Sequence, residues 1–143
     1  LAGELALRAG EVPEPFLDID DIADIAVAAL TTNDHTGEVY DVTGPRLLTF
    51  ADAIAEMATA TGRDIRYVTI SREAFQNGLA EAGVPTAHIE LLDYLFTVTR
   101  DGRNATVTND VQRALGRPAR DFRDYVRTVA ARGTWTPQPQ KVT

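Results

Sequence analysis

The stretch that decides the fold is Pro15-Phe16-Leu17-Asp18-Ile19-Asp20-Asp21-Ile22-Ala23-Asp24-Ile25-Ala26. Its apolar run, residues 16–19, has the composition of a short strand that leads directly into a helix. Asp20 or Asp21 can cap that helix, because a carboxylate accepts hydrogen bonds from the free N–H groups of the first turn. The apolar positions that follow have helical spacing and form one face: Ile22, Ile25, Ala26, Ala29 and Leu30. Asp18 is then expected at the C-terminal end of the strand, where open α/β sheets place their ligand crevice.

The rest of the chain alternates between β-rich runs and helical patterns. Strands are predicted at residues 38–42 and 66–70, with a third short candidate at 105–107. Thr49 and Asp52 have the spacing of a capping box, and Gly62 stands where a left-handed C-cap belongs. Further helices are predicted to start at Ser71 and to cover residues 87–100, 109–115 and 122–131. This alternation favours an α/β fold with a few short parallel strands.

Composition excludes several classes of function. The formal net charge of −7 argues against a nucleic-acid surface, which needs clustered cations. The chain has no cysteine, so disulfides and thiolate chemistry are absent. No apolar run is long enough to span a bilayer, and residues 1–9 lack the basic start of a signal peptide, so we expect a cytoplasmic protein without a membrane partner. Closely spaced carboxylates from Asp18 to Asp24 raise the question of a cation site, but capping and solvation explain them better and no metal is expected.

The helix predicted at 87–100 is apolar around more than half of its circumference. Such a helix is buried on several sides, or lines a pocket or an interface. We therefore expect the chain to form a homodimer with this helix at the contact.

Four separated motifs occur in one order along the chain. They are Phe16-Leu17-Asp18-Ile19-Asp20-Asp21-Ile22-Ala23, Gly37-Glu38-Val39-Tyr40-Asp41-Val42-Thr43-Gly44-Pro45, Leu48-Thr49-Phe50-Ala51-Asp52, and Thr108-Asn109-Asp110-Val111 continuing to Leu115-Gly116-Arg117-Pro118. Together they resemble the NmrA-like group of atypical, NAD(P)-binding short-chain dehydrogenases/reductases, and the resemblance covers the C-terminal half of such a protein only. It implies the C-terminal half of a Rossmann-like fold, in which a few strands accompany a helical substrate lobe.

The resemblance implies NAD(P) as the cofactor of the parent protein, bound by an N-terminal half with a glycine-rich turn. The ten glycines of this chain include no such turn, so we expect no cofactor site in the chain alone. None of its four tyrosines has a lysine four residues later, so the Tyr-x-x-x-Lys pair of the classical short-chain dehydrogenases is also absent, as the resemblance to the NmrA-like group allows. The chain begins with Leu1 rather than Met, and we expect it to be part of a longer protein, although a naturally short protein stays an alternative.

We therefore expect residues 1–135 to form the substrate-binding portion of an NmrA-like protein and residues 136–143 to form a flexible tail. The parent would transfer hydride between a nicotinamide cofactor and a small carbonyl or quinone, or would be a cofactor-sensing regulator descended from such an enzyme. The alternative is a non-catalytic binding module that docks a partner through its apolar helix. No catalytic residue is named, and the predicted substrate-binding residues are Phe16, Asp18, Phe75, Leu92 and Phe96.

Overall fold

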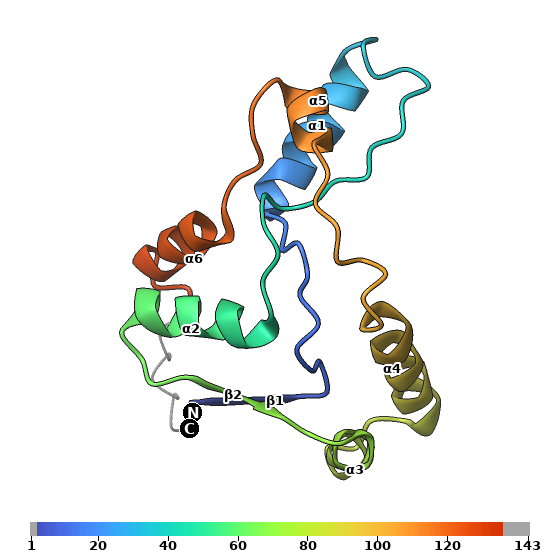
Figure 1. Cartoon of the computed structure of the whole chain (residues 1–143), viewed down its shortest axis with the longest axis vertical. Coiled ribbons are helices and arrows are strands. Elements are labelled where there is room, and N and C mark those ends of the chain that lie inside the picture. The colour runs from blue at the N-terminus through green and yellow to red at the C-terminus, as the bar shows by residue number, and fades with distance from the viewer. Residues whose placement is uncertain (1–2, 136–143) are drawn as a thin grey trace, which may run out of the picture.

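The computed structural model describes residues 3–135, so the tail predicted at 136–143 lies outside the described residues. The described part contains six helices and two strands (Figure 1). In chain order they are β1 (Glu4–Leu7), α1 (Ile19–Thr31), α2 (Phe50–Thr61), β2 (Arg66–Thr69), α3 (Arg72–Glu81), α4 (Thr86–Thr99), α5 (Asp110–Leu115) and α6 (Phe122–Ala131).

The two strands form one small parallel sheet. β1 pairs with β2 in a register that runs from Glu4 opposite Arg66 to Leu7 opposite Thr69. This confirms the predicted α/β class with few, short, parallel strands, and it confirms the strand predicted at 66–70. β1 was not predicted, although Leu5 and Leu7 are half-buried and alternate with exposed neighbours as a strand requires.

The strand predicted at 38–42 is wrong, because side chains of the distant α5 region occupy the backbone groups that a neighbouring strand would need. The carbonyl of Val39 accepts a hydrogen bond from Arg113 Nη2 at 2.6 Å, and the N–H of Asp41 donates to Asp110 Oδ2 at 2.7 Å. The carbonyl of Asp41 accepts from the Thr108 hydroxyl. The segment is thus extended but irregular.

The other two strand predictions are also wrong. Residues 16–18 are irregular, and the only pairing nearby in the described chain is an isolated antiparallel bridge between Glu14 and Leu48. Residues 105–107 follow tight turns, in which Ala105 N–H donates to the Gly102 carbonyl at 3.1 Å. Neither run pairs with the sheet, which within residues 3–135 consists of β1 and β2.

The helix predictions hold well. Thr49 and Asp52 form the predicted capping box of α2, and Gly62 ends that helix in the left-handed region with φ of 65°. Ser71 caps α3 by accepting from the N–H of Ala74. Each of these signals acts within one helical turn, which explains why the sequence alone reveals it.

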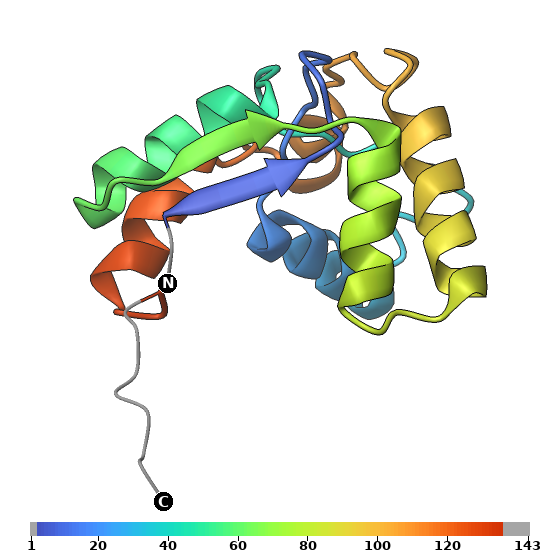
Figure 2. The ribbon, with the colours of Figure 1, turned by 90° about the horizontal axis from the view of Figure 1, so that it is seen from below.

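The helices pack in pairs around the sheet. α2 lies along β2 and against α6, α3 lies against α4, and α1 lies against α5 at the end of the molecule far from the strands (Figures 1 and 2). The buried apolar side chains of the described residues are few, with Val126, Ala9 and Val111 the most enclosed. Within residues 3–135, no helix is both long and apolar enough to cross a lipid bilayer.

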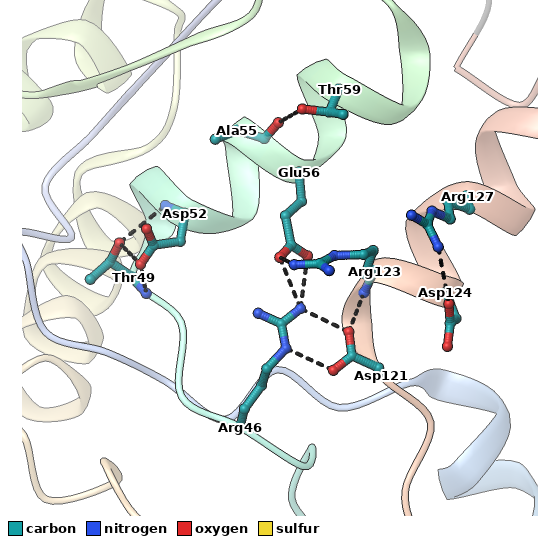
Figure 3. Close-up of polar contacts among 10 residues, drawn as sticks. All are labelled: Arg46, Thr49, Asp52, Ala55, Glu56, Thr59, Asp121, Arg123, Asp124 and Arg127. Carbon is teal, nitrogen blue, oxygen red and sulfur yellow. Dashed lines mark hydrogen bonds and ion pairs between the residues drawn. The ribbon is translucent and has the colours of Figure 1, made fainter.

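Ion pairs fasten the α2–α6 pair (Figure 3). Arg46 donates from Nε and Nη2 to the two carboxylate oxygens of Asp121 at 2.7 and 2.8 Å, and from Nη2 to Glu56 at 2.9 Å. Arg123 on α6 reaches Glu56 at 3.2 Å. The hydrogen bonds from Arg46 lower the pKa of Asp121 to about 2. Two carboxylates from α2 and from the start of α6 thus share one guanidinium.

The start of α1 differs from the prediction in two ways. Asp18, not Asp20 or Asp21, is the N-cap, and its carboxylate accepts from the N–H of Asp20 at 2.8 Å. Asp21 lies in the first turn but is fully buried, where it accepts hydrogen bonds from Arg117 and Arg120. The acidic cluster is therefore partly an ion-pair site, because burial of a carboxylate requires such partners.

The predicted apolar face of α1 is not covered by the described residues. Ile22 is 49% exposed and Leu30 is 86% exposed, and Val27 beside them is 60% exposed. α1 contacts α5 through the side that carries Asp21. An apolar stripe of this kind on a regular helix normally packs against another body.

Candidate functional site

A cavity of about 480 Å³ lies where three segments converge: the chain before α1, the chain before α2, and the loop after α4. Its lining residues are Glu14, Pro15, Phe16, Asp41, Thr43, Arg100, Arg103, Asn104 and Thr106. The size suits a small organic ligand. Seven of the nine lining residues have polar side chains, so the cavity can offer hydrogen bonds to oxygen or nitrogen atoms of a ligand.

The backbone on one side of the cavity is held by two close approaches. Glu14 exchanges two backbone hydrogen bonds with the buried Leu48, at 2.8 and 2.9 Å. Gly44 donates its N–H to the Pro15 carbonyl at 3.1 Å, and a Cβ atom at Gly44 would lie 1.8 Å from the Phe16 carbonyl oxygen. Only glycine permits this contact. Residues 14–16 are therefore fixed against residues 44–48.

Aromatic rings form the apolar support of the same wall. The centre of the Phe16 ring lies 5.3 Å from that of Phe50, in an edge-to-face arrangement, and 5.1 Å from that of Phe122. The guanidinium of Arg100 lies over the Phe50 ring at 4.5 Å from its centre. The stacking fixes the plane of Arg100 at the end of α4 without using its N–H groups.

Glu14 and Arg100 form an ion pair in this wall. Arg100 Nη1 lies 2.8 Å from Glu14 Oε1, and the two side chains are only 20% and 15% exposed. The distance is that of an ion pair, but the N–H bonds are misaligned, so Glu14 Oε1, Arg100 Nε and Arg100 Nη1 have no hydrogen-bond partner among the described residues. The two formal charges cancel.

The loop after α4 contributes a second arginine to the lining, Arg103. Arg103 donates to both carboxylate oxygens of Asp101 at 2.6–3.0 Å, and these hydrogen bonds lower the pKa of Asp101 and raise that of Arg103. Thr43 links the chain before α2 to the chain after α4, because its hydroxyl accepts a hydrogen bond from the N–H of Thr108 at 2.9 Å. The lining offers guanidinium, amide and hydroxyl groups for binding. Among the described lining residues there is no histidine, lysine, cysteine or tyrosine for proton transfer or covalent chemistry.

The structure separates the predicted substrate-binding residues. Phe16 lines the cavity. Asp18 caps α1 and lines a different hollow of about 460 Å³ beside Tyr125 and Trp135. Phe75 and Phe96 pack against each other at 5.1 Å between α3 and α4, and neither they nor the half-buried Leu92 belong to the lining of the first cavity.

Sequence reasoning missed Glu14 and Arg100. Glu14 stands between Pro13 and Pro15, which restrict its backbone and mark it as a fixed position. Arg100 follows the last residue of α4 and has the appearance of an ordinary helix-end cation. Their pairing joins residues 86 positions apart, so no local pattern reveals it.

Comparison with known proteins identifies relatives of this chain. No family model matches the chain. It is 34% identical over 129 residues to an NAD(P)H azoreductase of Xenophilus azovorans, a match that covers 90% of this chain and 45% of that protein. It is 35% identical over 124 residues to (4-alkanoyl-5-oxo-2,5-dihydrofuran-3-yl)methyl phosphate reductase of Streptomyces griseus, covering 87% of this chain and 44% of that protein. The chain thus spans less than half the length of these relatives.

Solved structures show the same fold. The triphenylmethane reductase of Citrobacter sp. superposes with a TM-score of 0.75 at 20% identity, over 91% of this chain and 45% of that one. The NADPH-dependent quinone oxidoreductase of Escherichia coli gives 0.74 at 20% identity, over 89% and 46%. Both neighbours belong to Rossmann-like reductases, and the matched part is their C-terminal portion. This sequence and fold similarity confirms the resemblance of the chain to the C-terminal portion of the NmrA-like group of NAD(P)-binding, atypical short-chain dehydrogenases/reductases.

Proposed function

We propose that this chain is the C-terminal half of an NAD(P)H-dependent reductase and supplies the substrate lobe of that enzyme. The observation that carries the proposal is the uncovered apolar face of α1, on which Ile22, Val27 and Leu30 are 49%, 60% and 86% exposed. Water is a poor environment for such a face, which favours a second body packed on it. More than half of the azoreductase relative lies outside the matched part and is large enough to be that body.

The reaction that fits is hydride transfer from the nicotinamide to a small carbonyl or quinone. The cavity supports this choice, because its arginine, amide and hydroxyl donors can bind a carbonyl oxygen and Phe16 can contact a flat ring. NAD(P) belongs to the other half of the enzyme, since no glycine-rich turn occurs in this chain. Asp18, Phe75, Leu92 and Phe96 stay proposals as contacts to the substrate in the assembled enzyme.

The test is turnover by the complete protein. The whole reading frame that contains this chain is expressed, and NADPH oxidation is followed with naphthoquinone as acceptor. The expected result is quinone-dependent oxidation by the complete protein and none by the 143-residue chain alone. A complete protein that binds neither NADH nor NADPH would overturn the proposal.

A second candidate function is a non-catalytic module that docks a partner, a second copy included, through α4. The observation in its favour is the solvent-facing side of that helix, where Leu91 is 52% exposed and Tyr94 is 62% exposed. Sedimentation of the complete protein and of its Leu91→Ser variant separates the two candidates. The module hypothesis predicts an oligomer that the variant dissociates, together with no quinone reduction.

A further inference from the structure

We infer that the substrate of this site is an uncharged carbonyl or quinone, and that Glu14 makes it so by neutralising Arg100. The inference rests on the reductase function proposed above and names the substrate class of the same cavity. It makes Glu14 a specificity-determining residue, because its charge decides which substrates are disfavoured.

The first argument is the position of the pair. Glu14 is held by its backbone bridge to Leu48, and Arg100 is held by its stacking on Phe50. In this arrangement Arg100 Nη1 lies 2.8 Å from Glu14 Oε1. The Arg100 guanidinium, whose charge is matched in this way, adds no net positive charge to the cavity.

The second argument is the balance of charge in the cavity. Two arginines, Arg100 and Arg103, and two carboxylates, Glu14 and Asp41, line it. Asp101 adds a third carboxylate, bound to Arg103 just outside the lining. An anionic substrate would lose its hydration on entry and gain no net attraction, whereas an uncharged carbonyl compound loses little.

The third argument is the misaligned geometry of the pair. A carboxylate and a guanidinium that only stabilised the fold would be expected to form the aligned, bidentate contact that Arg103 makes with Asp101. Glu14 and Arg100 do not, and Glu14 Oε1, Arg100 Nε and Arg100 Nη1 have no hydrogen bond among the described residues. Charged groups in a binding site often give specificity by disfavouring the wrong ligand.

The experiment compares two substrates that share a ring system, naphthoquinone and naphthoquinone sulfonate, with the complete protein and NADPH. In the wild-type protein we expect a KM for the sulfonate at least about tenfold above that for the neutral quinone. Glu14→Gln leaves the charge of Arg100 unmatched. We expect it to lower the ratio of the KM for the sulfonate to the KM for the neutral quinone by about tenfold. The reactivity difference between the two quinones cancels when ratios are compared between variants.

Two further variants complete the design. Arg100→Gln leaves the carboxylate unmatched and should raise the same ratio, which is the opposite shift and serves if Glu14→Gln fails to fold. Glu38→Gln removes a carboxylate of similar chemistry, paired with Arg113 at 2.6 Å on the surface and outside the cavity, and should leave the ratio unchanged.

The outcomes are distinct. Equal KM values in the wild-type protein, or a lower value for the sulfonate, would overturn the assignment of an uncharged substrate. Equal ratios in Glu14→Gln, Arg100→Gln and wild type would overturn the role of Glu14. If the complete protein turns over neither quinone, the proposed function fails separately, and dissociation constants of the same two compounds from calorimetry decide the selectivity by the same criteria.

Discussion

Asp21 and Arg120, 99 residues apart in the chain, are joined by two hydrogen bonds. The Asp21 carboxylate accepts one from the backbone N–H of Arg120 at 2.8 Å and one from the Arg120 guanidinium at 2.5 Å. Arg117 donates to the same carboxylate at 2.8 Å. Asp21 is completely buried, so these contacts replace all of its hydration. They attach α1 to the segment between α5 and α6, and α1 carries the apolar face on which the proposed function depends.

Loss of the Asp21 carboxylate should therefore be costly. Asp21→Ala removes the buried carboxylate and the acceptor of the Arg120 N–H, while Arg117 and Arg120 keep Asp24 as a partner at 2.6 and 2.9 Å. We expect the free energy of unfolding to fall by about 1–3 kcal/mol. Asp20→Ala is the matched control, because Asp20 is exposed in the same helical turn. Urea denaturation of both variants checks the difference, and a similar, small loss in both would refute the structural role of Asp21.

Asp18 should stabilise α1 as its N-cap. Asp18→Ala removes the hydrogen bond to the N–H of Asp20, and we expect a loss of about 0.5–2 kcal/mol. Asp18→Ser keeps a capping oxygen and should restore most of this loss. Thermal unfolding of the two variants is the measurement; equal melting temperatures for Asp18→Ala and wild type would mean that the cap contributes nothing.

The pair of Arg46 and Asp121 should make stability depend on acid pH. The hydrogen bonds from Arg46 lower the pKa of Asp121 from 3.8 to about 2, so folding favours the ionised carboxylate. The contribution is present above the unfolded pKa and is lost as the pH falls from about 4 to about 2. We expect it to be on the order of 1 kcal/mol, because the side chain is 32% exposed and solvent screens the pair.

Asp121→Asn tests this pH dependence while it keeps a residue that can cap α6. The difference in unfolding free energy between variant and wild type should be constant near neutral pH and should vanish near pH 2. Asp124→Asn, whose partner Arg127 lies 3.8 Å away on the surface, is the matched control for the loss of a carboxylate from α6. A difference that persists at pH 2 would assign the effect to packing instead of charge.

Gly44 should tolerate no side chain. A Cβ atom there would lie 1.8 Å from the Phe16 carbonyl oxygen, so Gly44→Ala must push the cavity wall away from residues 44–48. We expect a destabilisation of about 1–3 kcal/mol. Gly78→Ala in α3 meets no atom within 4 Å and should stabilise the helix by up to about 1 kcal/mol. Opposite signs in denaturant unfolding are the expected result, and a neutral Gly44→Ala would contradict the close approach.

The sequence predicted what is encoded within one helical turn. The box of Thr49 and Asp52 and the C-cap at Gly62 are in place, because each forms between residues close in the chain. The strand at 38–42 failed, since its backbone bonds go to Asp110 and Arg113, which no periodicity can identify. For the same reason the cavity was only partly predicted: Phe16 was found, but the pairing of Glu14 with Arg100 exists only in the folded chain.

Cofactor binding tests the central claim most directly, namely that this chain is the substrate half of a two-part NAD(P)H reductase. NADPH is titrated by calorimetry into the complete protein and, separately, into the 143-residue chain. Because pyrophosphate binding in this fold depends on a glycine turn that the chain does not contain, the account predicts micromolar affinity for the complete protein and about millimolar or weaker affinity for the chain. Micromolar binding by the chain alone, or no binding by the complete protein, would contradict it.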